Sequence, residues 1–407
     1  MLPKEFPYIK AIQINDCYAY QNFRIDLPLS NGKPFSHLII TGKNGSGKSS
    51  ILRGVERHFK IDEFKKIGQE RLSNLKNIVV NQPNNTIIKQ YQSQLAELES
   101  IIPYFNINDV TEFFKDNKDK FIFSYFKANR NSIANTVSSV TKETDFLNNL
   151  TNQNTSDYYI TQFKQFLVNK KVKQAFDQIK HNIVGVNQVN AFFSKLTKAF
   201  QQFFEDKNLE LIFEETAFEF YIKLSDGRRL MFNQLSDGFA AFSGILMDLF
   251  MRLDIARKTL NDVNADPCGI VLLDEPENHL HISAQYQVMP TLIAFFPNVQ
   301  FIIATHSPAV ISSIKNTTVF DLTSKEYETD KIVGSSFSEL MVSHFGLDNE
   351  FSPIADTIIH NVNSALKAYK NDKSKLNKEL GKIFIENHDY LSPTLKVELE
   401  SLILKAS

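Results

Sequence analysis

The chain has 407 residues, of which 43% are apolar, and a formal net charge of −1 at pH 7. A near-neutral charge gives no overall attraction to nucleic acid or to a membrane surface. The longest apolar-rich run, FAAFSGILMDLFM, is shorter than the roughly 20 residues of a membrane span, and the N-terminus lacks a secretion signal. Cys17 and Cys268 lie far apart. We therefore expect a cytoplasmic protein with reduced thiols.

The first part of the chain predicts alternating strands followed by a helix. Period-two alternation indicates strands over 8–16 and 23–29. A short buried strand that ends in glycine is expected over 37–42. Helical spacing of apolar residues then predicts a helix over 49–59.

Between residues 60 and 206 the pattern becomes mainly helical. Three segments combine helical periodicity with many polar residues, namely 86–102, 162–180 and 191–204. The Asn-rich stretch LNNLTNQNTS, 148–157, predicts a loop. One strand-like piece, KFIFSYFKANR, stands out at 120–130. We interpret this region as a mainly helical insertion into an α/β core.

Strands resume after the insertion, and the last part of the chain is helical. Strands are expected over 209–215, 217–224, 269–275 and 300–306, with helices over 239–252 and 283–295. The tail predicts helices near 353–370, 374–387 and 393–405. The predicted fold class is α/β, with a core formed by 1–59 and 207–330, an insertion at 60–206 and a helical C-terminal region at 331–407.

Residues 42–49, GKNGSGKS, fit the pattern G-x-x-x-x-G-K-[ST] between a predicted strand and a predicted helix. Glycines let backbone N–H groups turn toward an anion, and the helix start adds partial positive charge. Lys48 is expected to reach the β- and γ-phosphates of a nucleotide, and Ser49 to hold Mg²⁺. The expected phosphate-binding residues are Gly42, Asn44, Gly45, Ser46, Gly47, Lys48, Ser49 and Ser50. The alternative is an ordinary glycine-rich turn with a surface lysine.

Two apolar runs end in residues that suit phosphate chemistry. GIVLLDE ends in Asp274 and Glu275, and the carboxyl end of a parallel strand lies beside the phosphate crevice. We expect Asp274 to bind the magnesium, largely through water, and Glu275 to polarise the attacking water. FIIATH ends in His306, 32 residues after Asp274 (306 − 274). His306 is expected to donate to the γ-phosphate, although a lone histidine at a strand end is usually a satisfied polar residue.

The tetrapeptide LSDG occurs twice, at 224–227 and at 235–238. The first copy lies between two alternating runs, where an Asp-Gly pair predicts a hairpin turn with positive φ at both residues. The second copy precedes an apolar helix, for which Ser236 is a good N-cap. Gly238 is expected to keep the backbone amides at the helix start open to an anion. We therefore interpret the first copy as a turn and the second as an anion site.

This order of motifs resembles the ATP-binding cassette family. GKNGSGKS matches its Walker A loop, LSDG at 235–238 its signature motif, VLLDE its Walker B strand and ATH its switch histidine. The resemblance covers about 1–59 and 209–320. LLDEPENHLHISAQ is similar to the DEPE-x-HLHP pattern of the RecF, OLD and related AAA-type ATPases, and IKAIQINDCYAYQNFRIDL to the N-terminal pattern of that group. The resemblance implies an ATPase head built on a mixed sheet, with ATP and Mg²⁺ bound.

The family also implies a head-to-tail dimer. Ser236 and Gly238 of one subunit would complete the nucleotide site of the other. The D-loop at this interface corresponds to residues 277–281, chiefly Glu277, Asn278 and His279.

Some positions depart from the family or match it weakly. Phe239 follows LSDG, where the family often has a polar residue. The Q-loop glutamine has no clear match, and the segment in its place offers Asn129 and Arg130 instead, which leaves the second magnesium contact open. Arg24 either approaches the nucleotide, as a basic residue in this N-terminal segment sometimes does in the family, or lies on the surface.

The resemblance implies ATP hydrolysis by in-line attack of water. Two subunits would close over two ATP molecules and reopen after hydrolysis. After Val319 there is no D-x-D pair of the kind carried by the TOPRIM nuclease of OLD-like proteins. The chain therefore lacks an obvious effector of its own. We expect the ATPase subunit of a bacterial antiphage system, of the PtuA or AriA type, that controls a separately encoded nuclease or toxin.

Two other functions stay open. A RecF-like repair or recombination ATPase would bind DNA directly, with hydrolysis stimulated by DNA and an affinity that falls with salt. A transporter nucleotide-binding subunit would co-purify with a membrane protein. The near-neutral charge favours the defence interpretation, with nucleic acid as a second candidate partner and no membrane partner expected.

Overall fold

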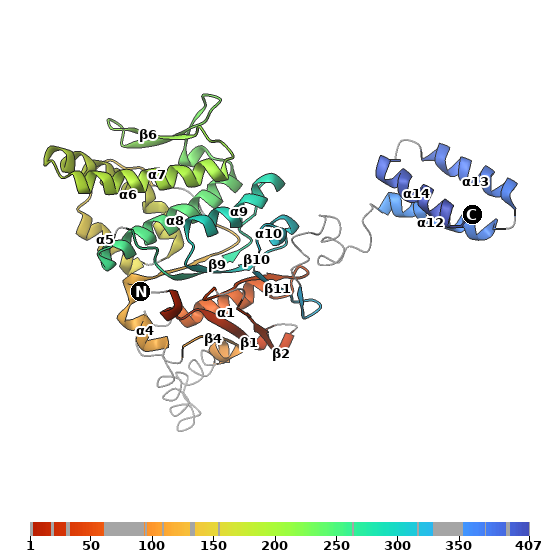
Figure 1. The fold of residues 1–407 in the computed structure, drawn as a ribbon, viewed down its shortest axis with the longest axis horizontal. Coiled ribbons are helices and arrows are strands. Elements are labelled where there is room, and N and C mark those ends of the chain that lie inside the picture. Colours follow the sequence, from red (N-terminus) through yellow and green to blue (C-terminus); the bar gives the residue numbers. More distant parts are fainter. Residues whose placement is uncertain are drawn as a thin grey trace, which may run out of the picture. The chain divides into compact units, whose positions relative to one another are not determined.

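The computed structural model divides the chain into two compact units, residues 1–335 and 336–407 (Figure 1). The structure describes residues 3–17, 20–29, 33–60, 93, 96–107, 110–130, 135–153, 155–262, 264–315, 317–328, 353–370, 372–387 and 391–406. Among the helices of these residues, none has the length and apolar character needed to cross a membrane.

A three-stranded antiparallel sheet opens the first unit. Its order is β2-β1-β4, with β1 at Ile9–Cys17, β2 at Tyr20–Asp26 and β4 at Ile101–Phe105. Strand β1 confirms the prediction for 8–16, whereas β2 begins and ends three residues earlier than predicted for 23–29, because Tyr20 already pairs with Cys17. The helical pattern predicted over 86–102 is wrong at its end, because Ile101 and Ile102 pair with the free edge of β1. Most of the rest of that segment lies outside the described residues.

The central sheet has six strands in the order β12-β11-β3-β10-β9-β5. In chain order these are β3 (His37–Thr41), β5 (Ile122–Phe126), β9 (Gly269–Asp274), β10 (Val299–Ala304), β11 (Thr317–Asp321) and β12 (Glu326–Glu328). Only β12 runs antiparallel to its neighbour. Every residue of β3, β9 and β10 is buried, as expected for parallel strands covered on both faces. The carboxyl ends of these strands therefore meet at one edge of the sheet.

Helix α1, Lys48–Lys60, follows β3 and packs against β4, β9 and β10. Its buried side chains, among them Ile51, Leu52 and Val55, join the core cluster shared by the antiparallel and central sheets. Five further helical segments belong to the described residues of this part of the unit: η1 (Pro3–Glu5), α4 (Val110–Asp116), η3 (Lys118–Lys120), α9 (Ile282–Phe295) and α10 (Pro308–Ser312).

The helical part of the first unit comprises α5 (Glu143–Gln153), α6 (Ser156–Ile179), α7 (Ile183–Phe203) and α8 (Asp237–Leu260). The segment 60–206, predicted as a mainly helical insertion, supplies α5 to α7 and also the sheet strands β4 and β5. The loop predicted over 148–157 is wrong, because α5 continues to Gln153 and α6 begins at Ser156. Thr155 caps α6 by accepting a hydrogen bond from the Tyr158 amide, so α6 begins directly after it.

A third sheet holds the first LSDG copy. Strands β6 (Glu210–Glu214), β7 (Glu219–Lys223) and β8 (Arg229–Met231) pair antiparallel, and η4 (Phe232–Gln234) follows. The turn between β7 and β8 confirms the predicted hairpin. However, only Gly227 has positive φ, at 89°, and its amide donates to Leu224 O at 3.0 Å. The connection is therefore a longer turn with one left-handed glycine instead of a two-residue turn.

The second unit consists of α12 (Pro353–Ala368), α13 (Lys373–Glu386) and α14 (Pro393–Ala406) in its described part. These bounds confirm the three helices predicted for the tail. The unit has a hydrophobic cluster of its own, which includes Ile358, Val362, Leu395 and Leu399.

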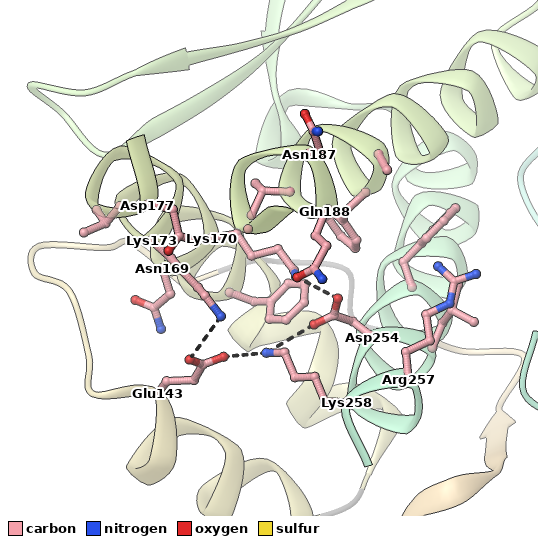
Figure 2. Close-up of a pocket in the computed structure, with 18 of the residues that line it drawn as sticks. Glu143, Asn169, Lys170, Lys173, Asp177, Asn187, Gln188, Asp254, Arg257 and Lys258 are labelled. Carbon is pink, nitrogen blue, oxygen red and sulfur yellow. Dashed lines mark hydrogen bonds and ion pairs between the residues drawn. The ribbon is translucent and has the colours of Figure 1, made fainter. Parts of the chain in front are cut away.

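Paired charges join α5, α6 and α8 around a hollow of about 1100 Å³ (Figure 2). Lys170 donates to Asp254 at 2.7 Å, and these side chains are only 11% and 15% exposed. Asp254 also faces Lys258 at 3.3 Å, and Lys258 donates to Glu143. Burial opposes the charged form of Asp254, but the two lysines offset it and hold its pKa below the usual value. These charges neutralise one another and hold the three helices together.

Replacing one member of this network should destabilise the fold. In Asp254→Leu the buried Lys170 loses its carboxylate, and we expect the free energy of unfolding to fall by about 3–5 kcal/mol. The double variant Lys170→Met/Asp254→Leu buries no unpaired charge at these positions and should recover most of that loss. Urea denaturation followed by circular dichroism measures both variants. An equal loss in the double variant would contradict the pairing.

Candidate functional site

The loop between β3 and α1 has the backbone conformation of a phosphate-binding loop. Gly42, Gly45 and Gly47 have φ of 131°, 77° and 95°, which other residues rarely adopt. At Gly47 a Cβ atom would also lie 2.9 Å from Cys17 Sγ. The loop ends at Lys48, where α1 begins, so the helix start faces the loop. Asn44 and Gly45 form its exposed tip.

Lys48 is buried inside this loop. Its ammonium donates to Gly42 O at 2.9 Å and to Lys43 O at 3.2 Å. Burial lowers the pKa of Lys48 to about 8, and nearby carboxylates, first Glu275 and then Asp274, work in the opposite direction. The buried hydroxyl of Ser46 has no hydrogen-bond partner within the described protein. A positive charge and a free hydroxyl therefore both lie in the loop.

A hydrogen bond links the loop to the end of β9. Ser49, in the first turn of α1 beside Ser50, donates from Oγ to Asp274 Oδ1 at 3.0 Å. Asp274 is only 4% exposed. Burial raises its pKa above the usual value, and the hydrogen bond from Ser49 offsets part of that rise. The residues expected to hold Mg²⁺ are thus brought together from positions far apart in the sequence.

Glu275, the expected catalytic carboxylate, has an unusual backbone. Its φ is 45°, a left-handed conformation that costs a non-glycine residue about 1–2 kcal/mol. Its amide donates to Ala304 O at 2.8 Å, and its Oε2 accepts from Asn278 Nδ2 at 2.9 Å. Its Oε1 lies 3.9 Å from His306 Nε2. Glu275 and His306 therefore face each other.

His306 follows β10 and is half-buried. Burial and the Lys48 ammonium lower the pKa of His306, while Glu275 works in the opposite direction. The ring is therefore neutral at neutral pH, with one nitrogen protonated and able to donate a hydrogen bond.

The turn after Glu275 was expected to face a second subunit, and the structure places its residues differently. Glu277 is 6% exposed, and it accepts hydrogen bonds from Thr305 Oγ1 and from the His306 amide. Asn278 directs its amide at Glu275. Only His279 of the three is exposed. Glu277 and Asn278 therefore make contacts within their own chain, and the role of this turn at a second subunit stays a prediction.

The signature segment is in place, but its glycine has another role than expected. Ser236 is the N-cap residue of α8, is exposed, and makes no capping hydrogen bond with its side chain. Gly238 is buried, and a Cβ atom there would lie 2.4 Å from His279 O. The glycine therefore permits close contact between α8 and the turn at 279–280, which the sequence did not predict, and the role of the amides at the helix start stays a prediction. The role of Ser236 in a second subunit stays a prediction.

Two of the basic residues that the sequence singled out take different positions. Arg24 forms an exposed ion pair with Asp26 at 2.7 Å and lies over the Tyr104 ring, so its contacts are outside the phosphate loop. Arg130 instead reaches the site. Its guanidinium donates to Asp274 O at 3.0 Å and to Glu275 O at 3.1 Å. Asn129 is exposed.

A hydrogen-bonded brace between the residues that follow β11 and the phosphate loop was not predicted from the sequence. Thr323 Oγ1 accepts from the Lys43 amide at 3.0 Å, and the Thr323 amide donates to Asp321 at 2.5 Å. Asp321 ends β11, which runs parallel to β3, so the brace lies beside the phosphate loop. The available signal was a short strand, TTVFD, that ends in an aspartate as β9 does.

A family model described as AAA domain, putative AbiEii toxin, Type IV TA system matches residues 64–312, more than half of the chain. The chain belongs to this AAA-domain family. Its predicted class, an α/β fold with a mixed sheet and helical parts, is confirmed.

Several named proteins are similar to this AAA-domain chain. The Septu protein PtuA of Bacillus mycoides (strain KBAB4) is 26% identical over 74% of this chain and 38% of its own length. The Retron Ec83 probable ATPase of Escherichia coli is 31% identical over 42% and 32%. The Retron Vc95 probable ATPase of Vibrio cholerae serotype O1 biovar El Tor is 24% identical over 74% and 61%. The matches thus span about a third to three fifths of these relatives. The predicted resemblance to PtuA-type ATPases is confirmed.

The buried Glu277 predicts a pH-dependent stability. Burial raises its pKa from the usual 4.5 to about 7, so the folded chain holds this proton more tightly than the unfolded chain does. The free energy of unfolding should therefore fall as pH rises from about 5 to about 8, by at most about 3 kcal/mol. Glu277→Gln, which is neutral throughout, should lack this contribution. Urea denaturation across this pH range measures the difference, and parallel curves for the two proteins would contradict it.

Proposed function

We propose that this chain binds ATP in the loop at 42–49 and hydrolyses it. The observation that carries the proposal is the 3.0 Å hydrogen bond between Ser49 and Asp274, with Lys48 buried beside it. This bond puts a hydroxyl and a carboxylate together at the start of α1, where an anion is favoured. A purely structural turn would not require a buried lysine, a free Ser46 hydroxyl and a carboxylate at one place.

The residues fit a magnesium ion that accompanies the nucleotide. Ser49 and Asp274 offer hard oxygen ligands from two directions, and Mg²⁺ usually keeps water and phosphate oxygens at its other positions. These two residues would hold the ion, which supplies charge neutralisation on the transferring phosphoryl group.

Three side chains would perform the hydrolytic step. Glu275 orients the attacking water and accepts its proton, because its carboxylate is held by Asn278 at the edge of the loop. His306, neutral at neutral pH, donates a hydrogen bond to the oxygen of the phosphoryl group that becomes more negative. Lys48 offsets the charge of the bound phosphates from inside the loop.

We also propose that two copies act head to tail. Ser236 supports this arrangement, since an exposed N-cap hydroxyl without a partner in its own helix is free to meet the nucleotide of another copy. The exposed His279 lies in the turn against which Gly238 packs, so His279 and the exposed Ser236 would face that copy together.

The cellular role follows from the relatives. The Septu protein PtuA and the two retron proteins, each named a probable ATPase, support a place in a bacterial antiphage system. In this proposal the chain works in the cytoplasm and controls a separately encoded nuclease or toxin through its ATP cycle. Stimulation of hydrolysis by DNA alone would favour direct DNA binding instead.

Single replacements separate binding from hydrolysis. Lys48→Ala should weaken ATP binding strongly, because the loop loses its only buried cation. Glu275→Gln should keep ATP affinity within a few fold and lower kcat by about 100-fold or more. Lys223→Ala, an exposed hairpin residue, is the control and should change neither. Phosphate release and isothermal calorimetry measure the two effects, and normal turnover in Glu275→Gln would contradict the catalytic role.

Mixing two inactive variants tests the head-to-tail arrangement. Lys48→Ala removes the lysine of the phosphate loop. Ser236→Arg blocks the surface that would contact the nucleotide bound to the other copy. In a mixed dimer one site has both defects and the other has neither. About half of the dimers in an equal mixture are mixed, and each has one working site of two, so about a quarter of the normal activity should return. A mixture as inactive as its components would show that each site is complete within one chain.

A further inference from the structure

The backbone at Glu275 needs outside support. This residue follows β9 directly and adopts a left-handed conformation with φ 45°. Such strain persists only where the surroundings hold it. The direction of the carboxylate depends on this conformation, since Glu275 faces His306 and Asn278 from it.

Arg130 supplies much of that support. One guanidinium nitrogen, Nη1, donates to Asp274 O at 3.0 Å, and the other, Nη2, donates to Glu275 O at 3.1 Å. The two carbonyls lie on either side of the Glu275 Cα atom. A planar guanidinium presents its N–H groups in a fixed fork, so it fits two neighbouring acceptors at once. It therefore fixes the orientation of both peptide groups that define the conformation of Glu275.

The same arginine is anchored to its own turn. Nη1 also donates to Lys127 O at 2.9 Å, in the segment that leaves β5. Since β5 pairs in parallel with β9, the ends of the two strands lie side by side. Asn278 makes a second, weaker link, with its amide 3.5 Å from Ala128 O. The turn after β5 is thus bonded to the turn after β9 mainly through one side chain.

The charge of Arg130 persists at this half-buried place. Burial lowers its pKa to about 10, and the carboxylates of Glu277, Asp274 and Glu275 oppose that effect. The guanidinium is therefore charged at neutral pH. Its bonds go to backbone carbonyls, so the carboxylates of Asp274 and Glu275 stay available for the nucleotide site.

We infer that Arg130 is a positioning residue, which acts on hydrolysis by holding the backbone of Glu275 between its two carbonyl contacts. It does not touch the phosphate loop through any bond of the described structure, so its effect should fall on turnover and not on ATP binding. This inference rests on the proposed ATP hydrolysis. It also assigns a role to the segment 120–130, which has no clear match to the Q-loop glutamine.

The test compares turnover with affinity. Arg130→Met keeps the length of the side chain without its donors, and Arg130→Lys keeps the charge without the fork. In both we expect kcat to fall by about 10- to 100-fold, since a displaced catalytic group costs that much, while the Kd for ATP changes by less than about threefold. Arg228→Met, at an exposed ion pair of the hairpin, is the matched control and should behave as the unchanged chain.

The outcomes separate the two proposals. Absent ATP hydrolysis by the unchanged chain would refute the proposed function itself. If the unchanged chain is active and Lys48→Ala is inactive, a kcat within about twofold of normal in both Arg130 variants would overturn the inference alone. An equal loss of ATP affinity and turnover would overturn it too, since a positioning residue changes kcat. Circular dichroism checks folding, and Arg130→Lys decides the result if Arg130→Met does not fold.

Discussion

The hydrogen bond between Ser49 and Asp274 is the contact on which the site depends. It joins the first turn of α1 to the last residue of β9, two elements separated by more than two hundred positions in the chain. The bond can form because β3, β10 and β9 lie next to one another in parallel, with Asp274 in register with Ala304. The order of the sheet thus brings the lysine loop, the acidic strand end and the histidine together.

The parts of this site that the sequence predicted are those whose signals are local. A strand, a glycine-rich turn and a helix that follow one another between residues 37 and 60 define the phosphate loop, and the ends of apolar strands define Asp274, Glu275 and His306. The parallel arrangement then follows from general rules of α/β folds. This is why these polar residues could be expected near one another without a structure, while their roles in catalysis stay predictions.

The rest depended on contacts that no local pattern contains. The arginine bridge to Glu275 spans 145 positions, and the threonine brace on Lys43 spans 280. Strand β4 was missed because its two isoleucines also fit the end of a helical pattern, and only the open edge of β1 decides between the two. Glu277 was assigned to an interface because its neighbours in sequence resemble a D-loop, and its burial beside Thr305 could not be read from that local pattern.

The close packing of Gly238 on the carbonyl of His279 has a consequence for interpreting homologous sequences. Any larger side chain would collide with the main chain there, whether or not a nucleotide ever approaches the helix. Selection for simple steric fit is therefore enough to retain the last letter of LSDG. In proteins with this fold, an intact motif glycine is evidence of a preserved helix–turn junction, and it does not by itself diagnose an active composite site.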